Sequence, residues 1–176
     1  MSATIKLEKK HFPVLLDELI SIISPLYSGT FIDCTFGQGG YSKKILSHKE
    51  NKIIALDRDS KTIKEATKLK KKFKSRFFFE NVTFSEIHKI KVRKENIKGI
   101  IFDLGYSTSQ INDPSKGISF KNKGRLNMRM GINNFSAHEV VNLMDFENLS
   151  KIFYYFGEEV KSKAIAKKIL LERNKK

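Results

Sequence analysis

Short apolar runs alternate with amphipathic segments along the first hundred residues of the chain. The apolar runs predict four strands, over residues 30–35, 52–56, 77–79 and 99–105. Residues with helical apolar spacing predict three helices, over 13–23, 41–47 and 61–73. We expect the fourth strand to be buried. Strands that alternate with helices predict an α/β fold with a parallel sheet, in which ligands bind at the carboxyl ends of the strands.

Two residues predict where helices begin. Pro13 suits the first turn of its helix, because a helix leaves its first N–H groups unpaired in any case. Asp59 or Ser60 should cap the helix over residues 61–73.

From residue 113 onward the pattern changes to turns and helices. Ser136 and Glu139 form a capping box, which predicts a helix that reaches about Met144. An apolar stripe at helical spacing ends before Gly157 and consists of Leu149, Ile152, Phe153 and Phe156. A last helix should cover residues 158–173. We therefore expect a sheet domain over residues 1–112 and a small helical lobe over residues 113–176.

The balance of charge is strongly basic. Thirty-four Lys and Arg residues against nineteen Asp and Glu residues give a net charge of +15, which attracts polyanions, nucleic acid foremost. Charge alone does not distinguish an RNA-binding surface from a solvated helix face over residues 64–74.

The rest of the composition narrows the class of protein. The N-terminus lacks the apolar core of a signal peptide, and no apolar run is long enough to span a bilayer, so we expect a cytoplasmic protein without membrane contact. Cys34 is the one cysteine and is expected to be a small core residue.

The strongest chemical signal is a strand that leads into a glycine turn, Phe31-Ile-Asp-Cys-Thr-Phe-Gly-Gln-Gly-Gly-Tyr-Ser. Asp57 follows at the end of the next strand, where a carboxylate can accept hydrogen bonds from ribose hydroxyls. The glycine spacing is not that of the dinucleotide fingerprint, which disfavours NAD and FAD. S-adenosylmethionine has a ribose but no phosphate, and it fits this pattern better.

Seven ordered blocks between residues 11 and 159 resemble those of the RsmH (MraW) family. The blocks are His11-Phe-Pro-Val-Leu-Leu-Asp-Glu, Asp33-Cys-Thr-Phe-Gly-Gln-Gly-Gly-Tyr-Ser, Ala55-Leu-Asp-Arg-Asp, Asp103-Leu-Gly-Tyr-Ser-Thr-Ser-Gln, Gly117-Ile-Ser-Phe, Leu126-Asn-Met-Arg-Met and Tyr155-Phe-Gly-Glu-Glu. The resemblance implies a Rossmann-like class I S-adenosylmethionine methyltransferase that methylates N4 of a cytidine in the decoding centre of 16S ribosomal RNA. Its partner would be that RNA or the small ribosomal subunit.

The resemblance also implies roles for residues of the cofactor pocket. Gly39, Gly40 and Tyr41 would contact the methionine end of S-adenosylmethionine, and Asp57 would hold the ribose. No metal ion is expected.

Three further residues would complete the pocket, and each has a structural alternative. Phe84 would lie beside the adenine or belong to the core, Gln110 would bind the cofactor or be a surface amide, and Asp103 would complete the pocket or cap a helix. Asp103, or a carbonyl within residues 104–107, is the candidate acceptor for the N–H protons of the cytosine.

Aromatic or Arg contacts from the helical lobe would present the unstacked base, with Arg129, Tyr154 and Tyr155 as candidates. Packing between helices is the alternative role for these three side chains.

The chain departs from the family pattern at several positions. Tyr41 stands where the family usually has His, Lys116-Gly-Ile where it has Arg-Gly-Phe, and Asn127 and Gly131 where it has Asp. The family also continues beyond the length of this chain, which resembles its N-terminal portion. The sheet should then be incomplete, so we expect either self-association or a missing C-terminal portion that covers strand four.

Two other functions remain open at this stage. One is a non-catalytic RNA-binding or ribosome-associated remnant of the fold, and the other is a nucleotide-dependent oxidoreductase.

Overall fold

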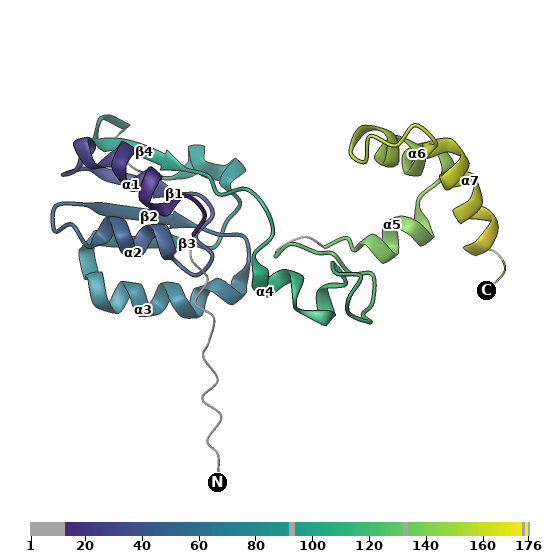
Figure 1. Cartoon of the computed structure of the whole chain (residues 1–176), viewed down its shortest axis with the longest axis horizontal. Helices are drawn as coiled ribbons and strands as arrows, with labels where there is room; N and C mark the ends of the chain where they lie inside the picture. The colour runs from purple at the N-terminus through teal and green to yellow at the C-terminus, as the bar shows by residue number, and fades with distance from the viewer. Residues whose placement is uncertain (1–12, 92–93, 132–133, 174, 176) are drawn as a thin grey trace, which may run out of the picture. The chain divides into compact units, whose positions relative to one another are not determined.

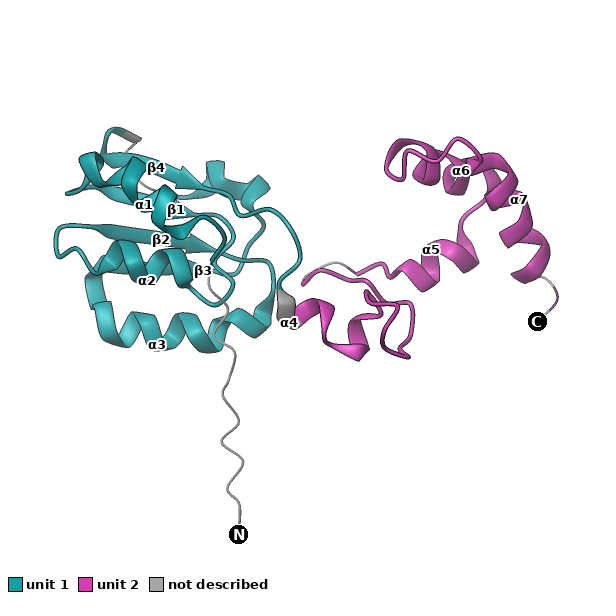
Figure 2. Ribbon diagram, viewed as in Figure 1, with its two compact units in different colours: residues 1–107 teal, residues 108–176 magenta. Residues whose placement is uncertain are grey.

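The structure is a computed structural model that describes residues 13–91, 94–131, 134–173 and 175. His11 and Phe12, which open the first family-like block, lie outside the described residues. The chain divides into two compact units, residues 1–107 and residues 108–176, and each is described by itself (Figure 2). The functional boundary expected between residues 112 and 113 stays a prediction.

The first unit is built on a parallel four-stranded sheet with the order β3-β2-β1-β4 (Figure 1). Its strands are β1 (Thr30–Asp33), β2 (Lys52–Leu56), β3 (Phe77–Glu80) and β4 (Ile97–Ile101). In the central pair, Asp33 of β1 is opposite Ala55 of β2 on one side and Ile101 of β4 on the other. This order is the one that begins a Rossmann-like sheet, and it confirms the predicted α/β fold.

Three helices cover one face of the sheet: α1 (Leu16–Ile23), α2 (Gly40–Leu46) and α3 (Ile63–Phe73). Phe31, Ile53 and Phe77 point from the three strands into the core beneath these helices and are fully buried. Leu69 of α3 packs into the same cluster. The apolar residues of each helix therefore lie on one side, which packs against the sheet, as their spacing in the sequence predicts.

A shorter cluster covers part of the opposite face. Ile32, Cys34 and Leu56 pack there against Ile87, which lies in a 3-10 helix (Phe84–Lys89), and Ile90, which follows that helix. Cys34 is a small core residue, as predicted, and is 2% exposed.

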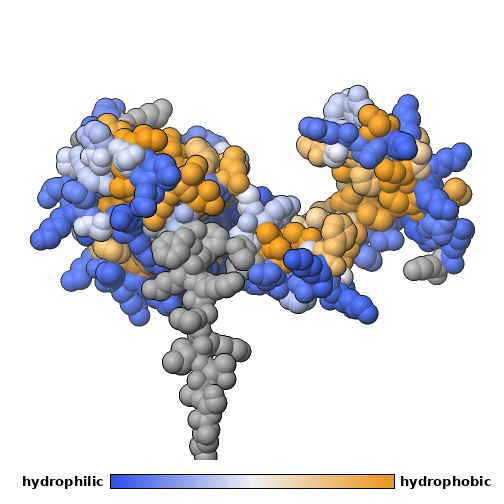
Figure 3. Space-filling view, in the orientation of Figure 1, coloured by the Kyte–Doolittle hydropathy of each residue, from blue (hydrophilic) through white to orange (hydrophobic). Residues whose placement is uncertain are grey.

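The apolar pattern predicts a buried fourth strand, which is wrong for the unit described, whereas the expected incomplete sheet with this strand at its edge is confirmed. β4 has β1 on one side only, and Ile100 and Phe102 are 47% and 49% exposed. Ile22 of α1 is also exposed and lines the same cavity as Ile100 and Phe102. Figure 3 shows apolar surface on this unit. An apolar run shows that a strand can be buried, but not that the chain supplies what buries it.

Element boundaries differ from the predictions where the backbone turns sharply. α1 begins three residues after Pro13, because Leu15 has a φ of 52° and lies outside the helical region. Of the two predicted capping residues, Asp59 and not Ser60 is the N-cap. Its side chain accepts a hydrogen bond from the Lys61 N–H in a 3-10 turn (Ser60–Thr62) that leads into α3. Two further 3-10 turns, Lys74–Arg76 and Lys94–Asn96, precede β3 and β4.

The second unit contains only helices and turns among its described residues. Its elements are α4 (Thr108–Ile111), a 3-10 turn (Pro114–Lys116), α5 (Ala137–Leu143), α6 (Phe146–Tyr155) and α7 (Ser162–Arg173). The capping box of Ser136 and Glu139 is confirmed. α7 begins four residues later than predicted, after Glu158 with its φ of 51°, and Phe156 is exposed rather than packed in the stripe.

Arg173 fastens the end of α7 to the end of α5, since its guanidinium donates to the carbonyls of Val141 and Met144. The helices of the described segments are all too short or too polar to cross a membrane.

Two polar side chains fix the turn between α2 and β2. The fully buried Asn51 accepts a hydrogen bond from the Ser28 N–H at 2.9 Å and donates to the Ile45 carbonyl at 3.1 Å. Arg76 donates to the carbonyls of Leu46, His48 and Asn51. Backbone groups that the sheet and helix leave unpaired are thereby satisfied.

We expect Asn51→Ala to destabilise the first unit by about 3 kcal/mol, because it strips the partners from one backbone donor and one acceptor in the core. Urea unfolding followed by circular dichroism measures the change. Ser47→Ala, which removes an exposed side-chain bond to the Lys44 carbonyl, should cost less than about 1 kcal/mol. Equal losses in the two variants would contradict the role assigned to Asn51.

Candidate functional site

The glycine turn connects β1 to α2 in a shape that requires glycine. Gly37 and Gly39 have φ angles of 53° and 72°, and the Gly39 N–H donates to the Phe36 carbonyl at 2.7 Å. A Cβ on Gly39 would lie 2.7 Å from the Phe36 ring, and a Cβ on Gly40 would lie 2.2 Å from Cγ of Pro13. Gly37 and Gly39 are thus required by their left-handed backbone, and Gly39 and Gly40 by close packing against Phe36 and Pro13.

Asp57 lies beyond the end of β2 and is bonded to this turn. Its Oδ2 accepts the Gly37 N–H at 2.7 Å, its Oδ1 accepts the Asp59 N–H at 2.8 Å, and the side chain of Asn81 donates to its carbonyl. Burial raises the pKa of Asp57. A carboxylate offers about four acceptor positions, so two remain for a ligand.

Asp33 belongs to the second family-like block but was not among the predicted site residues. It ends β1, is fully buried, and accepts hydrogen bonds from the Ser42 hydroxyl at 2.7 Å and the Thr35 N–H at 3.3 Å. Burial raises its pKa to about 6, with smaller contributions from Asp57 and Asp103. The available signal was an acidic residue at the end of an otherwise apolar strand, beside the glycine turn.

Tyr41 and Asp103 lie close together near the ends of β1 and β4. The Tyr41 ring is buried, and its hydroxyl donates to the Val14 carbonyl. Burial, and then the neighbouring Asp103 carboxylate, raise the pKa of Tyr41. The Asp103 N–H donates to Oγ1 of Thr35 at 2.7 Å, so the segment after β4 is held against the segment after β1.

Phe84 begins its 3-10 helix in contact with the segment after β4. Its ring packs edge to face against Phe102, with 5.6 Å between the centroids, and both rings are about half exposed. Phe84 is therefore partly exposed at the surface of the unit, and the alternative that it belongs to the core is wrong. The pair offers an apolar surface next to Asp103.

The first unit thus brings most of the predicted site residues together at the carboxyl ends of β1, β2 and β4. Hydrogen bonds link the glycine turn to Asp57 and the Thr35 hydroxyl to Asp103. A cavity of about 420 Å³ between α1 and β4 includes Tyr41 and Asp103 in its lining, but not Asp57 or Phe84. The predicted site residues therefore do not all line this one cavity.

The remaining candidates lie in the second unit. Gln110 lies in α4. Asn127 accepts a hydrogen bond from Nε of Arg129 at 2.8 Å and donates to the Ser115 carbonyl at 3.1 Å. Tyr154 and Tyr155 pack edge to face at 5.1 Å and are 54% and 69% exposed. Both tyrosines are open to solvent within this unit, as a stacking role would require.

The electrostatics of the site favour a cationic ligand. Asp33, Asp57 and Asp103 end three adjacent strands, and the charge of each of the other two raises the pKa of Asp33. Arg58 is a cation that acts on Asp57. A pyrophosphate would be repelled by three carboxylates, whereas an ammonium or sulfonium group would be attracted.

Comparisons with known proteins agree with the sequence blocks. The model of the MraW methylase family matches residues 8–176. The protein named ribosomal RNA small subunit methyltransferase H of Orientia tsutsugamushi (strain Ikeda) is 42% identical over 166 residues, which cover 94% of this chain and 53% of that protein. Proteins of the same name from Rickettsia bellii (strain OSU 85-389) and Zymomonas mobilis (subsp. mobilis strain ATCC 31821 / ZM4 / CP4) are 38% and 39% identical, over 93% of this chain and 53% and 50% of their own lengths. The chain spans about half the length of these relatives.

We expect Asp33 to make stability depend on pH. Because folding raises its pKa from 3.8 to about 6, the protonated carboxyl contributes stability that is present below pH 3.8 and is lost as the pH rises through about 6. Asp33→Asn keeps an acceptor but cannot ionise, so its free energy of unfolding minus that of the wild type should rise by about 3 kcal/mol across this range.

Urea unfolding at a series of pH values measures this difference. Ser42→Ala provides the mechanistic control, because it removes a donor that favours the ionised form and should move the wild-type transition to higher pH. A difference between Asp33→Asn and wild type that stays flat with pH would show that Asp33 is not the titrating group.

Proposed function

The chain belongs to the MraW methylase family, and we propose that it serves S-adenosylmethionine-dependent methylation of N4 of a cytidine in the decoding centre of 16S ribosomal RNA. One observation supports the cofactor above the others. Three carboxylates lie at or just beyond the ends of adjacent strands beside the glycine turn, which suits a ligand that is cationic and lacks phosphates.

The residues of the first unit fit the parts of that cofactor. Asp57 has two free acceptor positions for the ribose diol, since its other two hold Gly37 and Asp59. The resemblance assigns Gly39 and Gly40 to the methionine end. The resemblance assigns Tyr41 to this pocket as well, and the cofactor role that it gives to Gln110 of the second unit stays a prediction.

Phe84 and Phe102 offer the adenine an apolar wall. Their rings are half exposed and are already packed against each other, so a planar base can cover them without rearrangement of the core. Bound S-adenosylmethionine supplies an activated methyl group on its sulfonium.

We assign Asp103 as the proton acceptor that activates the nucleophile, the exocyclic nitrogen of cytosine. The exocyclic nitrogen of cytosine is a weak nucleophile because its lone pair is delocalised into the ring. A carboxylate that accepts its N–H proton localises that lone pair and can take the proton once the methyl group has moved. The bond from the Asp103 N–H to Thr35 holds the backbone of this residue in place while its side chain stays half exposed.

The RNA substrate accords with the charge of the chain and with exposed groups in the second unit. The net charge of +15 draws in a polyanion. Tyr154 and Tyr155 are exposed aromatic rings on which an unstacked base can stack, and Arg129 is held by Asn127.

A non-catalytic RNA-binding module is the second candidate function. It is favoured by the same charge and by Asn127, an amide where the family usually has a carboxylate. It predicts RNA binding without methyl transfer.

Calorimetric titration with S-adenosylmethionine should show binding that Asp57→Asn weakens at least about 100-fold, because hydrogen bonds to a charged group are each worth about 1.5–3 kcal/mol. Glu80→Gln is the matched control: it neutralises an exposed acid at the end of β3 and should leave the affinity unchanged.

NAD serves as the competing ligand in this titration. Binding of NAD in place of S-adenosylmethionine would favour the oxidoreductase, and binding of neither by folded protein would favour the RNA-binding module.

Asp103→Asn should lower the rate of methyl transfer to small-subunit RNA by about 10²-fold or more at saturating S-adenosylmethionine. Single-turnover measurement with tritiated methyl groups separates this from cofactor binding. An unchanged maximal rate with a raised KM for S-adenosylmethionine would restrict Asp103 to the cofactor.

A further inference from the structure

About half of the net positive charge of the chain is concentrated on one helix and its flanking turns. Residues 61–76 carry eight Lys and Arg side chains and a single carboxylate, Glu65, which gives +7 of the total +15. The segment comprises α3 with the 3-10 turns before and after it. Positive charge of this density exceeds what the composition of the whole chain would place on an average helix.

Two of these cations stabilise the fold. Nζ of Lys70 donates to the Phe77 carbonyl at 2.8 Å and lies 4.1 Å from the centre of the Phe78 ring. Arg76 is bonded to three carbonyls in the turn before β2. They are therefore not the groups to consider for an external partner.

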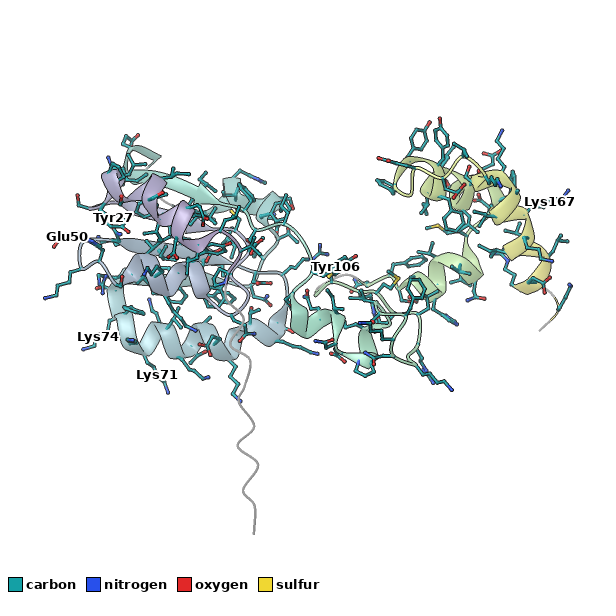
Figure 4. The ribbon with its side chains drawn as sticks, viewed as in Figure 1. Tyr27, Glu50, Lys71, Lys74, Tyr106 and Lys167 are labelled. Carbon is teal, nitrogen blue, oxygen red and sulfur yellow. The ribbon has the colours of Figure 1, made fainter. Side chains whose placement is uncertain are left out.

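Three other lysines form a ridge along the outer face of α3. Lys64, Lys68 and Lys71 follow the spacing i, i+4, i+7, which places them on one side of the helix, opposite the buried Ala66 and Leu69. All three are exposed. With a rise of about 1.5 Å per residue, the ridge extends about 10 Å along the helix axis. Figure 4 shows the labelled Lys71 projecting outward from the helix.

The only acidic residue of the segment is neutralised within the protein. Glu65 pairs with Lys43 of α2 at 2.6 Å and with Lys68 at 2.9 Å, and these contacts lower its pKa. Within the part of the chain that the structure describes, no carboxylate pairs with Lys64 or Lys71. A polyanion that approaches the ridge therefore meets little repulsion.

We propose that the ridge of Lys64, Lys68 and Lys71 binds the phosphate backbone of the RNA substrate. The inference rests on the proposed function and gives it a docking surface outside the cofactor site. α3 follows β2, so the ridge begins on the side of the sheet where Asp57 lies and runs away from it. Lysine side chains bind phosphates as flexible point charges without reading sequence. The ridge positions the RNA, and other groups select the base.

RNA suits the ridge better than a membrane surface does. A helix that binds lipid must expose an apolar face to the acyl chains. The apolar side of α3, with Ala66 and Leu69, is instead buried against the sheet. Lysines dominate the outer face of α3, and its exposed apolar side chain is Ile63 at the first residue of the helix.

The test measures the salt dependence of RNA binding. Fluorescence anisotropy with a labelled oligouridylate of about 12 nucleotides gives the slope of log affinity against log salt, to which each phosphate contact on single strands contributes about 0.7. The triple variant Lys64→Gln, Lys68→Gln, Lys71→Gln should bind more weakly, with a slope smaller by about 2 in magnitude.

The matched control removes three exposed lysines elsewhere in the first unit, by Lys49→Gln, Lys52→Gln and Lys91→Gln. It removes the same total charge and should keep a slope close to that of the wild type. Equal reductions in both variants, no change in the ridge variant, or no RNA binding by the wild type would each overturn the proposal. So would ridge-dependent binding to phosphatidylserine vesicles without RNA binding.

Two further readouts separate this inference from the proposed function. Circular dichroism should show unchanged helix content in the ridge variant, because glutamine and lysine have similar helix propensities. Calorimetric affinity for S-adenosylmethionine should be unchanged as well. Failure of cofactor binding with ridge-dependent RNA binding intact would reject the methyltransferase but not the ridge.

Discussion

The bond between the Asp57 carboxylate and the Gly37 amide is the interaction on which the site depends. It ties the loop after β2 to the loop after β1, and the second carboxylate oxygen ties in the Asp59 amide as well. The shape of the glycine turn and the position of the carboxylate therefore cannot vary independently. Groups that a ligand requires are held before the ligand arrives, which lowers the conformational cost of binding.

Charge in this protein is divided between two places with opposite sign. Carboxylates gather where the strands end, and lysines gather on the outer side of α3. The proposed cationic cofactor and polyanionic substrate are thereby recognised by separate surfaces. The basic exterior raises the local concentration of RNA, while the acidic site does not compete for its phosphates.

Much of the fold could be predicted from the sequence because β1 and β2 are short, apolar and flanked by helices whose apolar residues recur at the right spacing. Local signals also identified the capping box of Ser136 and the position of Asp57 after β2, where its carboxylate meets the glycine turn. The start of α1 could not be predicted, since nothing in the sequence requires a left-handed Leu15. Asp33 was missed because an acid in an apolar strand becomes informative only when its burial and its bond to Ser42 are known.

The apolar pattern of β4 alone predicted a buried strand, whereas the resemblance to longer family members predicted an incomplete sheet with β4 at its edge, which the structure confirms. The apolar residues of β4 indicate that another segment can cover this strand, but they do not indicate which segment does so. The backbone of β4 leads directly to Asp103, and the bond to Thr35 joins that residue to the glycine turn. Under the proposed role of Asp103, a segment or molecule that pairs with β4 and orders Asp103 would strengthen ligand binding, and by thermodynamic reciprocity the ligand would strengthen that pairing by the same factor. Pairing at the open edge of the sheet would thus regulate the affinity of the site.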